Sequence, residues 1–353
     1  MMRKAVISIF ILAMFVLGNT LYVRGSNFET EEVNFAFSPP HLHNGVNYVT
    51  FSDASNSLSS AGYPVMPYES KVMTFPFGTK IKGIDVSIGD VQTIHLDKKI
   101  APAPEAVPLN GAEPKAAQEG EIYQSNEPYP SNWVEWSAGA GLEDGKHVVF
   151  LTIRAFPARY LPASNEIEYV NDMSIEVRYT PPSESLLTND VYDLLIIAPS
   201  EFTDTLQPLV DHKNSHGMRT IMVTLDEIYN SNYFPVQGRD GAEKMKYFIK
   251  DSIEEWGIKY VLLVGGKKSY ITGNWGYDGP TKVDDSLWWV PVRYAALDDQ
   301  AEKGYVSDFY FADIYDAGGN FSSWDTNGDG IYAAWSFKYG KDPIDGYPDV
   351  YVG

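Results

Sequence analysis

Hydrophobic and polar positions alternate differently in the two halves of this chain. From residue 27 to about residue 185, short apolar or alternating runs are separated by Gly, Pro, Asn and Asp. The clearest runs are Val46–Phe51, Lys71–Phe75, Ile81–Ile88, Val148–Ile153 and Ser174–Tyr179. Short strands with turn residues between them predict an antiparallel β-sandwich.

Two segments of this first half do not fit a strand pattern. Residues 101–120 contain four prolines and few large apolar side chains, so we expect a long exposed loop or an extended arm. Residues 181–185, Pro-Pro-Ser-Glu-Ser, form a short polar linker. The linker predicts a domain boundary close to residue 185.

The second half changes to alternating strands and helices. Tyr192–Ala198, Thr220–Thr224 and Tyr260–Val264 are continuous apolar runs, which are typical of strands covered on both faces. Helical spacing separates them at Asp204–His216 and at Asp240–Trp256. This order predicts a doubly wound, mostly parallel α/β sheet.

Local signals mark the ends of these predicted helices. Asp240 and Glu243 form a capping-box pattern at the start of the second helix. Gly217 and Gly257 stand where C-terminal caps are expected. Two further strands are predicted at Trp288–Tyr294 and Phe309–Ile314.

The first 25 residues have the organisation of a secretory signal peptide. Arg3 and Lys4 precede an uncharged apolar run at 5–17, and Gly25-Ser26 supplies small residues for cleavage. The run is shorter than the roughly 20 residues that span a bilayer. An uncleaved signal anchor and an ordinary core helix are the alternatives. No later segment is apolar enough to cross a membrane, so we expect a secreted or cell-surface protein.

Composition narrows the function further. A chain of 353 residues suggests about two domains after the signal peptide is removed. The formal charge of −20 repels phosphates and argues against nucleic-acid binding. The chain contains no cysteine, so it has no disulfides and no thiol nucleophile. Neither oligomeric state nor any catalytic residue is predicted from these 353 residues.

The sharpest local motif is Asp-Thr-Asn-Gly-Asp-Gly at residues 325–330. Asp325, Asn327 and Asp329 place side-chain oxygens at alternate positions, and the carbonyl of Ile331 follows, as in the first half of a calcium loop. The twelfth position is Ser336 instead of Glu, so the usual bidentate ligand is missing. The alternative is a polar turn. The sequence predicts a structural Ca²⁺ site whose remaining ligand is Asp313, Asp316, Asp342, Asp345 or water.

The other candidate motifs are better interpreted as structural features than as functional sites. The Gly-Gly-Lys-Lys run at 265–268 lacks the spacing of a phosphate loop and reads as a strand-end turn. His212 and His216 share a helix face, but Lys213 stands where a zinc protease motif needs glutamate. The acid pairs at 284–285 and 298–299 read as solvated loops.

Several stretches, in order, resemble the amino-terminal portion of the gingipain-type, caspase-like cysteine peptidases of family C25. In the first half they are GYPVMP (62–67), VMTFP (72–76), APAP (101–104) and FPARYLP (156–162). In the second half they are YDLLIIAPSEF (192–202), HKNSHG (212–217), EWGIKYVLLVGG (255–266), SDFYFADI (307–314), DTNGDGIY (325–332) and DGYPDVYVG (345–353).

The resemblance implies a zymogen with a signal peptide at 1–25, a β-rich propeptide at 27–185 and a caspase-like peptidase subdomain at 187–353. The fold class is then α+β multidomain, with an α/β domain that is incomplete at its C-terminus. The family's catalytic histidine and cysteine lie beyond the point that matches Gly353, so His216-Gly217 is not the catalytic pair. Protein or peptide substrates are implied for the full-length enzyme. The alternative is a secreted, calcium-stabilised binding module without enzyme activity.

Overall fold

The computed structural model describes residues 28–43, 48–105, 116–182, 189–268, 287–296, 304–336 and 340–353. The predicted signal peptide, the centre of the proline-rich arm and the end of the linker lie outside these ranges. The acid pairs at 284–285 and 298–299 lie outside them as well. The described chain forms a β-rich part, residues 28–182, and an α/β part, residues 189–353.

The β-rich part is built from antiparallel strands. They are β1 (Glu29–Ala36), β2 (His41–Leu42), β3 (Val49–Thr50), β4 (Asn56–Leu58), β5 (Met66–Pro76), β6 (Lys80–Ile88), β7 (Gln92–His95), β8 (Val134–Glu143), β9 (Lys146–Ala155), β10 (Ala158–Leu161), β11 (Glu166–Tyr169) and β12 (Asp172–Thr180), with a 3-10 helix η1 (Glu121–Gln124) before β8. Their sheet orders are β1-β12-β6, β4-β5-β9-β8, β10-β11-β7 and β2-β3. Each of the five apolar runs in the sequence overlaps one of these strands.

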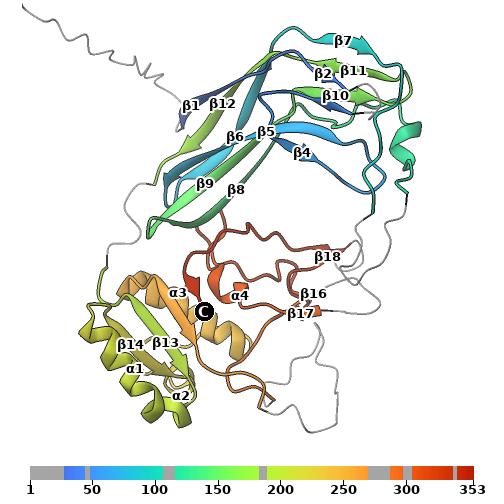
Figure 1. Cartoon of the computed structure of the whole chain (residues 1–353). Helices are drawn as coiled ribbons and strands as arrows, with labels where there is room; N and C mark the ends of the chain where they lie inside the picture. The colour runs from blue at the N-terminus through green and yellow to red at the C-terminus, as the bar shows by residue number, and fades with distance from the viewer. Residues whose placement is uncertain are drawn as a thin grey trace, which may run out of the picture.

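Two of the sheets share one hydrophobic core. Met173, Ile175 and Val177 of β12 alternate with exposed or half-buried neighbours, as a strand with one buried face requires. Leu151 and Ile153 of β9 are buried in the same cluster. The sheet that contains β12 therefore packs against the sheet that contains β9, and Figure 1 shows these strands in the upper half of the molecule.

The α/β part contains a four-stranded parallel sheet in the order β14-β13-β15-β20. Its elements are β13 (Leu194–Ala198), η2 (Ser200–Phe202), α1 (Thr203–Ser215), β14 (Thr220–Thr224), α2 (Leu225–Tyr229), α3 (Gly241–Trp256), β15 (Tyr260–Leu263), β16 (Tyr294–Ala296), β17 (Gly304–Val306), α4 (Phe309–Ala312), β18 (Trp335–Ser336), β19 (Gly340–Lys341) and β20 (Tyr351–Val352). The pairs β16-β17 and β18-β19 are short antiparallel hairpins. The predicted strands and helices between residues 192 and 264 are all present.

Strand β13 is covered on both faces. Leu195 and Ile197 pack in the cluster that includes α3, whereas Leu194 and Ile196 pack with Val210 of α1. This is the burial that its unbroken apolar sequence predicts. The predicted α+β multidomain class is therefore confirmed. Among the described residues, no helix combines the length and the apolar character needed to cross a bilayer.

Helix α3 begins and ends at the residues that the sequence indicates. The Asp240 carboxylate accepts a hydrogen bond from the Glu243 backbone N–H at 2.8 Å. The Glu243 carboxylate accepts from the N–H of Arg239 at 2.6 Å, so the reciprocal bond is displaced by one residue. Gly257 has φ +73°, and a Cβ there would lie 1.9 Å from the carbonyl oxygen of Asn189. Only glycine fits this cap.

Two strand predictions after residue 270 are wrong. Phe309–Ala312 forms the helix α4 instead of a strand, because a short and mostly buried apolar run carries no hydrophobic period that would distinguish a helix from a strand. The run from Trp288 is a strand only from Tyr294, in β16. Before it, Trp289 pairs with Gly266 and Pro291 has no N–H to donate to a ladder.

Candidate functional site

The carboxyl ends of β13, β14 and β15 meet at one edge of the parallel sheet. Open α/β sheets bind ligands at this edge, where successive connections diverge to opposite sides. A cavity of about 450 Å³ lies there. Its lining comes from the ends of β13 and β14, the first turns of α2 and α3, and the chain after β15: Pro199, Ser200, Glu201, Leu225, Asp226, Tyr229, Gly241, Lys244, Lys268, Trp288, Trp289 and Pro291.

The polar groups of this cavity do not form a nucleophile and base pair. The Ser200 hydroxyl donates to the Asp226 carboxylate at 2.5 Å. The Lys268 ammonium lies 5.2 Å from the ring centroid of Trp289, which in turn packs on Phe202. No histidine lines the cavity among the described residues. The site offers acidic, basic and aromatic contacts for binding, and these 353 residues supply no thiol to it.

The glycine-lysine run after β15 makes ordinary strand-end contacts. Lys267 forms an isolated bridge with Trp288, and the Lys268 N–H donates to the carbonyl of Leu287 at 2.8 Å. A Cβ on Gly265 would lie 2.7 Å from Val290, so close packing accounts for this glycine. These contacts agree with the strand-end turn that the sequence predicts at residues 265–268.

His212 and His216 are exposed at the end of α1. Their rings stack with centroids 4.2 Å apart, and His216 Nδ1 lies 2.8 Å from the carbonyl oxygen of His212. Gly217 follows with φ +82°. These contacts cap the helix, as expected for surface histidines at a helix C-terminus.

The predicted calcium residues lie in one compact loop. The Gly330 N–H donates to Asp325 Oδ2 at 3.2 Å, which ties the sixth loop position to the first. The Asp329 N–H donates to Asn327 Oδ1 at 3.0 Å, and the Ile331 N–H donates to Asp329 Oδ1 at 2.8 Å. The Asp325 side chain is fully buried, and its Oδ1 atom has no hydrogen-bond partner among the described residues.

An oxygen set of this kind fits Ca²⁺, because calcium prefers carboxylate, amide and carbonyl oxygens. Within the described ranges, no group of three or more Asp, Glu or His side chains is arranged to hold a metal ion. The loop supplies the carboxylates of Asp325 and Asp329, and its other oxygen donors are the Asn327 amide and the Ile331 carbonyl. Asp342 contacts the loop directly, where it accepts from the Thr326 N–H and hydroxyl and from the Ala334 N–H.

The other acids that the sequence offered as the remaining ligand face different partners. Asp316 accepts from the N–H groups of Gly318 and Asn320 within its own turn. Asp345 accepts from the N–H of Ala140, which belongs to the β-rich part. Asp313 accepts from the Ser322 hydroxyl at 2.7 Å and from the Trp324 indole.

The loop is joined to the first turn of α3 by two arginines. Arg239 bridges Asp325 at 2.5 Å and Glu243 at 2.9 Å. Arg293 is 2% exposed and donates to both carboxylate oxygens of Asp240, at 2.8 and 2.9 Å. Its guanidinium lies 3.6 Å from the Tyr332 ring centroid. Nothing in the sequence pattern pointed to these arginines as links to the loop, because Arg239 is 86 residues from Asp325 and Arg293 is 53 residues from Asp240.

Lys246 is a second buried cation in α3. Its ammonium donates to the carbonyl of Ser322 and lies 4.1 Å from the ring centroid of Tyr310. Burial lowers the pKa of Lys246 to about 7, although the carboxyl groups of Asp313 and Asp349 oppose the shift. One signal was available in the sequence, since Lys246 follows Met245 on the apolar face of the predicted helix.

The β-rich part inserts side chains into the α/β part. Phe77 and Ala140 belong to the same hydrophobic core as Leu195 and Ile197 of β13. The Phe77 ring lies 5.0 Å from that of Tyr315 and 5.6 Å from that of His147, centroid to centroid. The two parts therefore share a core instead of touching only at their surfaces.

Titratable groups at this contact are shifted toward their neutral forms. Burial lowers the pKa of His147 to about 4, and the hydrogen bond to the Asp349 backbone only partly opposes it. Burial, with the nearby Asp313 carboxyl, raises the pKa of Asp345 to about 7. Burial also raises the pKa of Asp349 well above its ordinary value. The charged forms of these groups are thus disfavoured at the contact between the parts.

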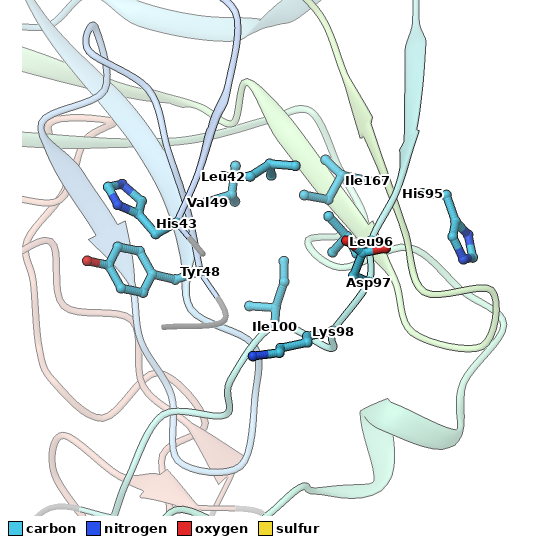
Figure 2. Close-up of a pocket in the computed structure, with 10 residues that line it drawn as sticks. All are labelled: Leu42, His43, Tyr48, Val49, His95, Leu96, Asp97, Lys98, Ile100 and Ile167. Atoms are coloured by element: carbon cyan, nitrogen blue, oxygen red, sulfur yellow. The ribbon is translucent and has the colours of Figure 1, made fainter. Parts of the chain in front are cut away.

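A second cavity, of about 170 Å³, lies within the β-rich part. Figure 2 shows Leu42, Leu96 and Ile167 around it, with His43 and Tyr48 stacked at one side and His95 directed away. Its lining contains one acid, Asp97, and Lys98. The polar side chains of His43, His95, Asp97 and Lys98 do not converge on a common point in Figure 2. The cavity at the sheet edge is therefore the better candidate site.

Family comparisons give two matches, which overlap over residues 187–203. The family model for the C25 propeptide matches residues 26–203, which is half of the chain. The model for peptidase family C25 matches residues 187–353. The chain belongs to the gingipain-type C25 cysteine peptidases, and it carries the family's propeptide.

Two solved structures from Porphyromonas gingivalis are similar at low identity. The first, a complex of the pro- and mature domains of RgpB, is 16% identical with a TM-score of 0.34, covering 51% of this chain and 90% of that chain. The second, a structure on the zymogenic latency of gingipain K, is 16% identical with a TM-score of 0.37, covering 43% of this chain and 88% of that chain. No match was found among curated proteins.

Proposed function

We propose that this chain is the front portion of a secreted cysteine endopeptidase that is exported as a zymogen. Residues 1–25 direct export, residues 27–185 form an inhibitory propeptide, and residues 187–353 form the first, truncated portion of a caspase-like peptidase domain. Membership of family C25 and the presence of its propeptide support a peptidase precursor that acts on proteins or peptides.

The observation that carries this proposal is the docking of the β-rich part on the α/β part. Phe77 enters the core of the α/β part, and the N–H groups of Ala140 and Leu142 bind Asp345 and Pro348. A propeptide that shares a core with its peptidase stays in place during export. Such docking is what a latent precursor needs.

Catalysis requires residues that these 353 positions do not contain. Thiolate attack needs a cysteine and a base that activates it, and the sequence has no cysteine. We therefore place the catalytic cysteine and histidine after Gly353. The cavity at the carboxyl edge of the sheet would then border the substrate channel that those residues complete.

Reading the gene past codon 353 tests this assignment. We expect an in-frame continuation that encodes a strand, a His-Gly pair and a later strand ending at cysteine. A stop codon directly after codon 353 would contradict the peptidase proposal. It would leave a secreted binding module, stabilised by calcium, as the alternative.

We also propose a structural Ca²⁺ bound by Asp325, Asn327, Asp329 and the carbonyl of Ile331. The buried and unpartnered Oδ1 of Asp325 supports the site, since a cation would satisfy this atom. Calcium would hold the loop against the first turn of α3, because Asp325 is also bonded to Arg239.

Calcium is therefore expected to raise the melting temperature of the chain by a few degrees, since ligand at about 100 times Kd adds about 2.7 kcal/mol. Asp329→Ala should abolish the rise, whereas Asp316→Ala, in a neighbouring exposed turn, should retain it. The measurement is differential scanning calorimetry with calcium and with EDTA. An unchanged melting temperature of the parent chain would count against the site.

A further inference from the structure

Asn327 stands directly before Gly328 in the exposed part of the 325–330 loop, where residues 326–329 are all exposed. Gly328 has φ +74°, and apart from its chain neighbours no described residue has an atom within 4 Å of the position that a Cβ would take. The backbone nitrogen of the next residue can attack an asparagine side chain, and a glycine places no side chain beside that nitrogen. The loop therefore contains both reactants of an intramolecular reaction.

Two hydrogen bonds hold the Asn327 amide against Asp329. The Asp329 N–H donates to Asn327 Oδ1 at 3.0 Å, and Asn327 Nδ2 donates to Asp329 Oδ2 at 3.0 Å. The first bond stabilises the negative charge that Oδ1 gains when the side-chain carbonyl is attacked. The second places a carboxylate beside the nitrogen that would leave. Asp329 thus polarises the bond that has to break.

We propose that Asn327 is a site of self-modification, at which its side-chain amide is hydrolysed through a cyclic imide with Gly328. The Gly328 nitrogen forms a bond to Asn327 Cγ, the Cγ–Nδ2 bond breaks, and ammonia leaves with the proton of the Gly328 N–H. Water then opens the imide. Its addition at Cγ gives aspartate, and its addition at the backbone carbonyl carbon gives isoaspartate, whose main chain runs through Cγ. The net reaction converts an amide and one water molecule into a carboxylate and ammonium.

Asn214 provides a contrast within the same molecule. It is exposed and precedes a small residue, Ser215, but it lies in the last turn of α1. Its side chain is held by Thr220, whose N–H donates to Asn214 Oδ1 at 2.8 Å and whose carbonyl accepts from Nδ2 at 3.2 Å. Helical N–H groups point to carbonyls four residues earlier, away from the preceding side chain. Of these two asparagines, only Asn327 should react.

Bound Ca²⁺ should suppress the reaction, and this part of the inference rests on the calcium site proposed above. Asn327 Oδ1 is one of the proposed ligands, so the amide must leave the ion before Cγ can reach the Gly328 nitrogen. With calcium at about 100 times Kd, only about 1% of loops are empty, and the rate should fall by as much as about 100-fold. The extent of modification then records the time that a chain has spent without calcium.

The test incubates the full chain at neutral pH, either with EDTA or with excess calcium. Peptide mapping by mass spectrometry follows the replacement of amide by carboxylic acid at each asparagine. In EDTA, residue 327 should react at least about 100-fold faster than residue 214, the factor that loss of attack geometry costs, and Gly328→Ala should slow it at least about 10-fold. Gly319→Ala is the matched control and should leave the rate unchanged, since Gly319 has φ +76° and equally open surroundings in a neighbouring turn.

Three results separate the modification from the calcium site. Equal rates at residues 327 and 214 in EDTA, or an unchanged rate in Gly328→Ala, would overturn the modification. A calcium-induced rise in melting temperature without slower reaction at residue 327 would overturn its control by calcium. Fast reaction at residue 327, with no effect of calcium on either melting temperature or rate, would contradict the calcium site and support the modification alone.

Discussion

Asp240→Ala is expected to lower the free energy of unfolding by about 2–3 kcal/mol, less than the full cost of breaking a buried ion pair, because the Arg293 side chain is 2% exposed but the Asp240 side chain is 39% exposed. Arg293 is almost completely buried, and both of its terminal nitrogens donate to Asp240. Although burial opposes ionisation of Asp240, Arg293 holds the pKa of this carboxyl below its ordinary value. Alanine would leave the guanidinium charged and unpaired, and it would also remove the N-cap of α3.

Urea denaturation near neutral pH measures this loss. Asp308→Ala is the matched control, since Asp308 is exposed at the start of α4 and makes no side-chain cap hydrogen bond. The double variant Asp240→Ala with Arg293→Met should be more stable than Asp240→Ala alone, because no unpaired charge remains. A loss below about 1 kcal/mol for Asp240→Ala would show that the ion pair does not organise the start of α3.

The second large effect is on the pH dependence of folding stability, to which two groups at the contact between the parts contribute in opposite directions. The pKa of His147 is lowered from 6.5 to about 4, so its contribution is present above pH 6.5 and is lost as the pH falls toward 4. The pKa of Asp345 is raised from 3.8 to about 7, so its contribution is present below pH 3.8 and is lost as the pH rises toward 7. Between pH 4 and pH 6.5 the two slopes cancel.

Substituting either residue should reveal the pH dependence of stability that the other contributes. In His147→Gln, stability should fall relative to the parent chain as the pH rises from 4 to 6.5, by about 3 kcal/mol over the window. In Asp345→Asn, the difference should have the opposite sign and a similar size. His147 faces Phe77, Tyr315 and the Asp349 backbone. Asp345 faces Asp313 and the N–H groups of Ala140 and Tyr347.

Denaturant titrations at pH 4.5, 5.5 and 6.5 measure both profiles. Differences from the parent chain are the quantity to compare, because Asp349, whose pKa is also raised, remains in every variant. The Asp345 carboxyl contributes to that raised pKa, so His147→Gln gives the cleaner comparison of the two variants. Lys246, with its pKa near 7, contributes its slope above this window. Parallel profiles for the parent chain and His147→Gln would contradict the buried, neutral state of His147.

Local signals in the sequence predicted much of the fold. Asp240, Glu243 and Gly257 marked the ends of α3, because capping depends on residues that are neighbours along the chain. The apolar run of β13 indicated a strand covered on both faces, and the structure places α1 and α3 on opposite sides of it. The strand prediction at Phe309–Ala312 was wrong, since a short apolar run, buried at Tyr310, Phe311 and Ala312, does not distinguish a strand from a helix.

Long-range contacts carried the information that the sequence could not provide. Arg293 meets Asp240 across 53 residues, and Tyr347 meets Thr152 across 195. Nothing in the sequence indicated that the ring of Tyr347 packs over Gly139 and Gly141. The calcium loop is intermediate, because its ligands are adjacent in sequence while the partner of Asp325, Arg239, is remote.

The most direct test of the central claim is activity-based labelling of the natural protein. A thiol-directed peptidase probe would be applied to the culture medium and cells of the organism that carries this gene, and labelled proteins would be digested and sequenced by mass spectrometry. The account predicts a labelled protein that contains peptides from residues 189–353 together with a probe-modified cysteine from later in the same chain. A protein that ends at Gly353 and takes up no probe would contradict it.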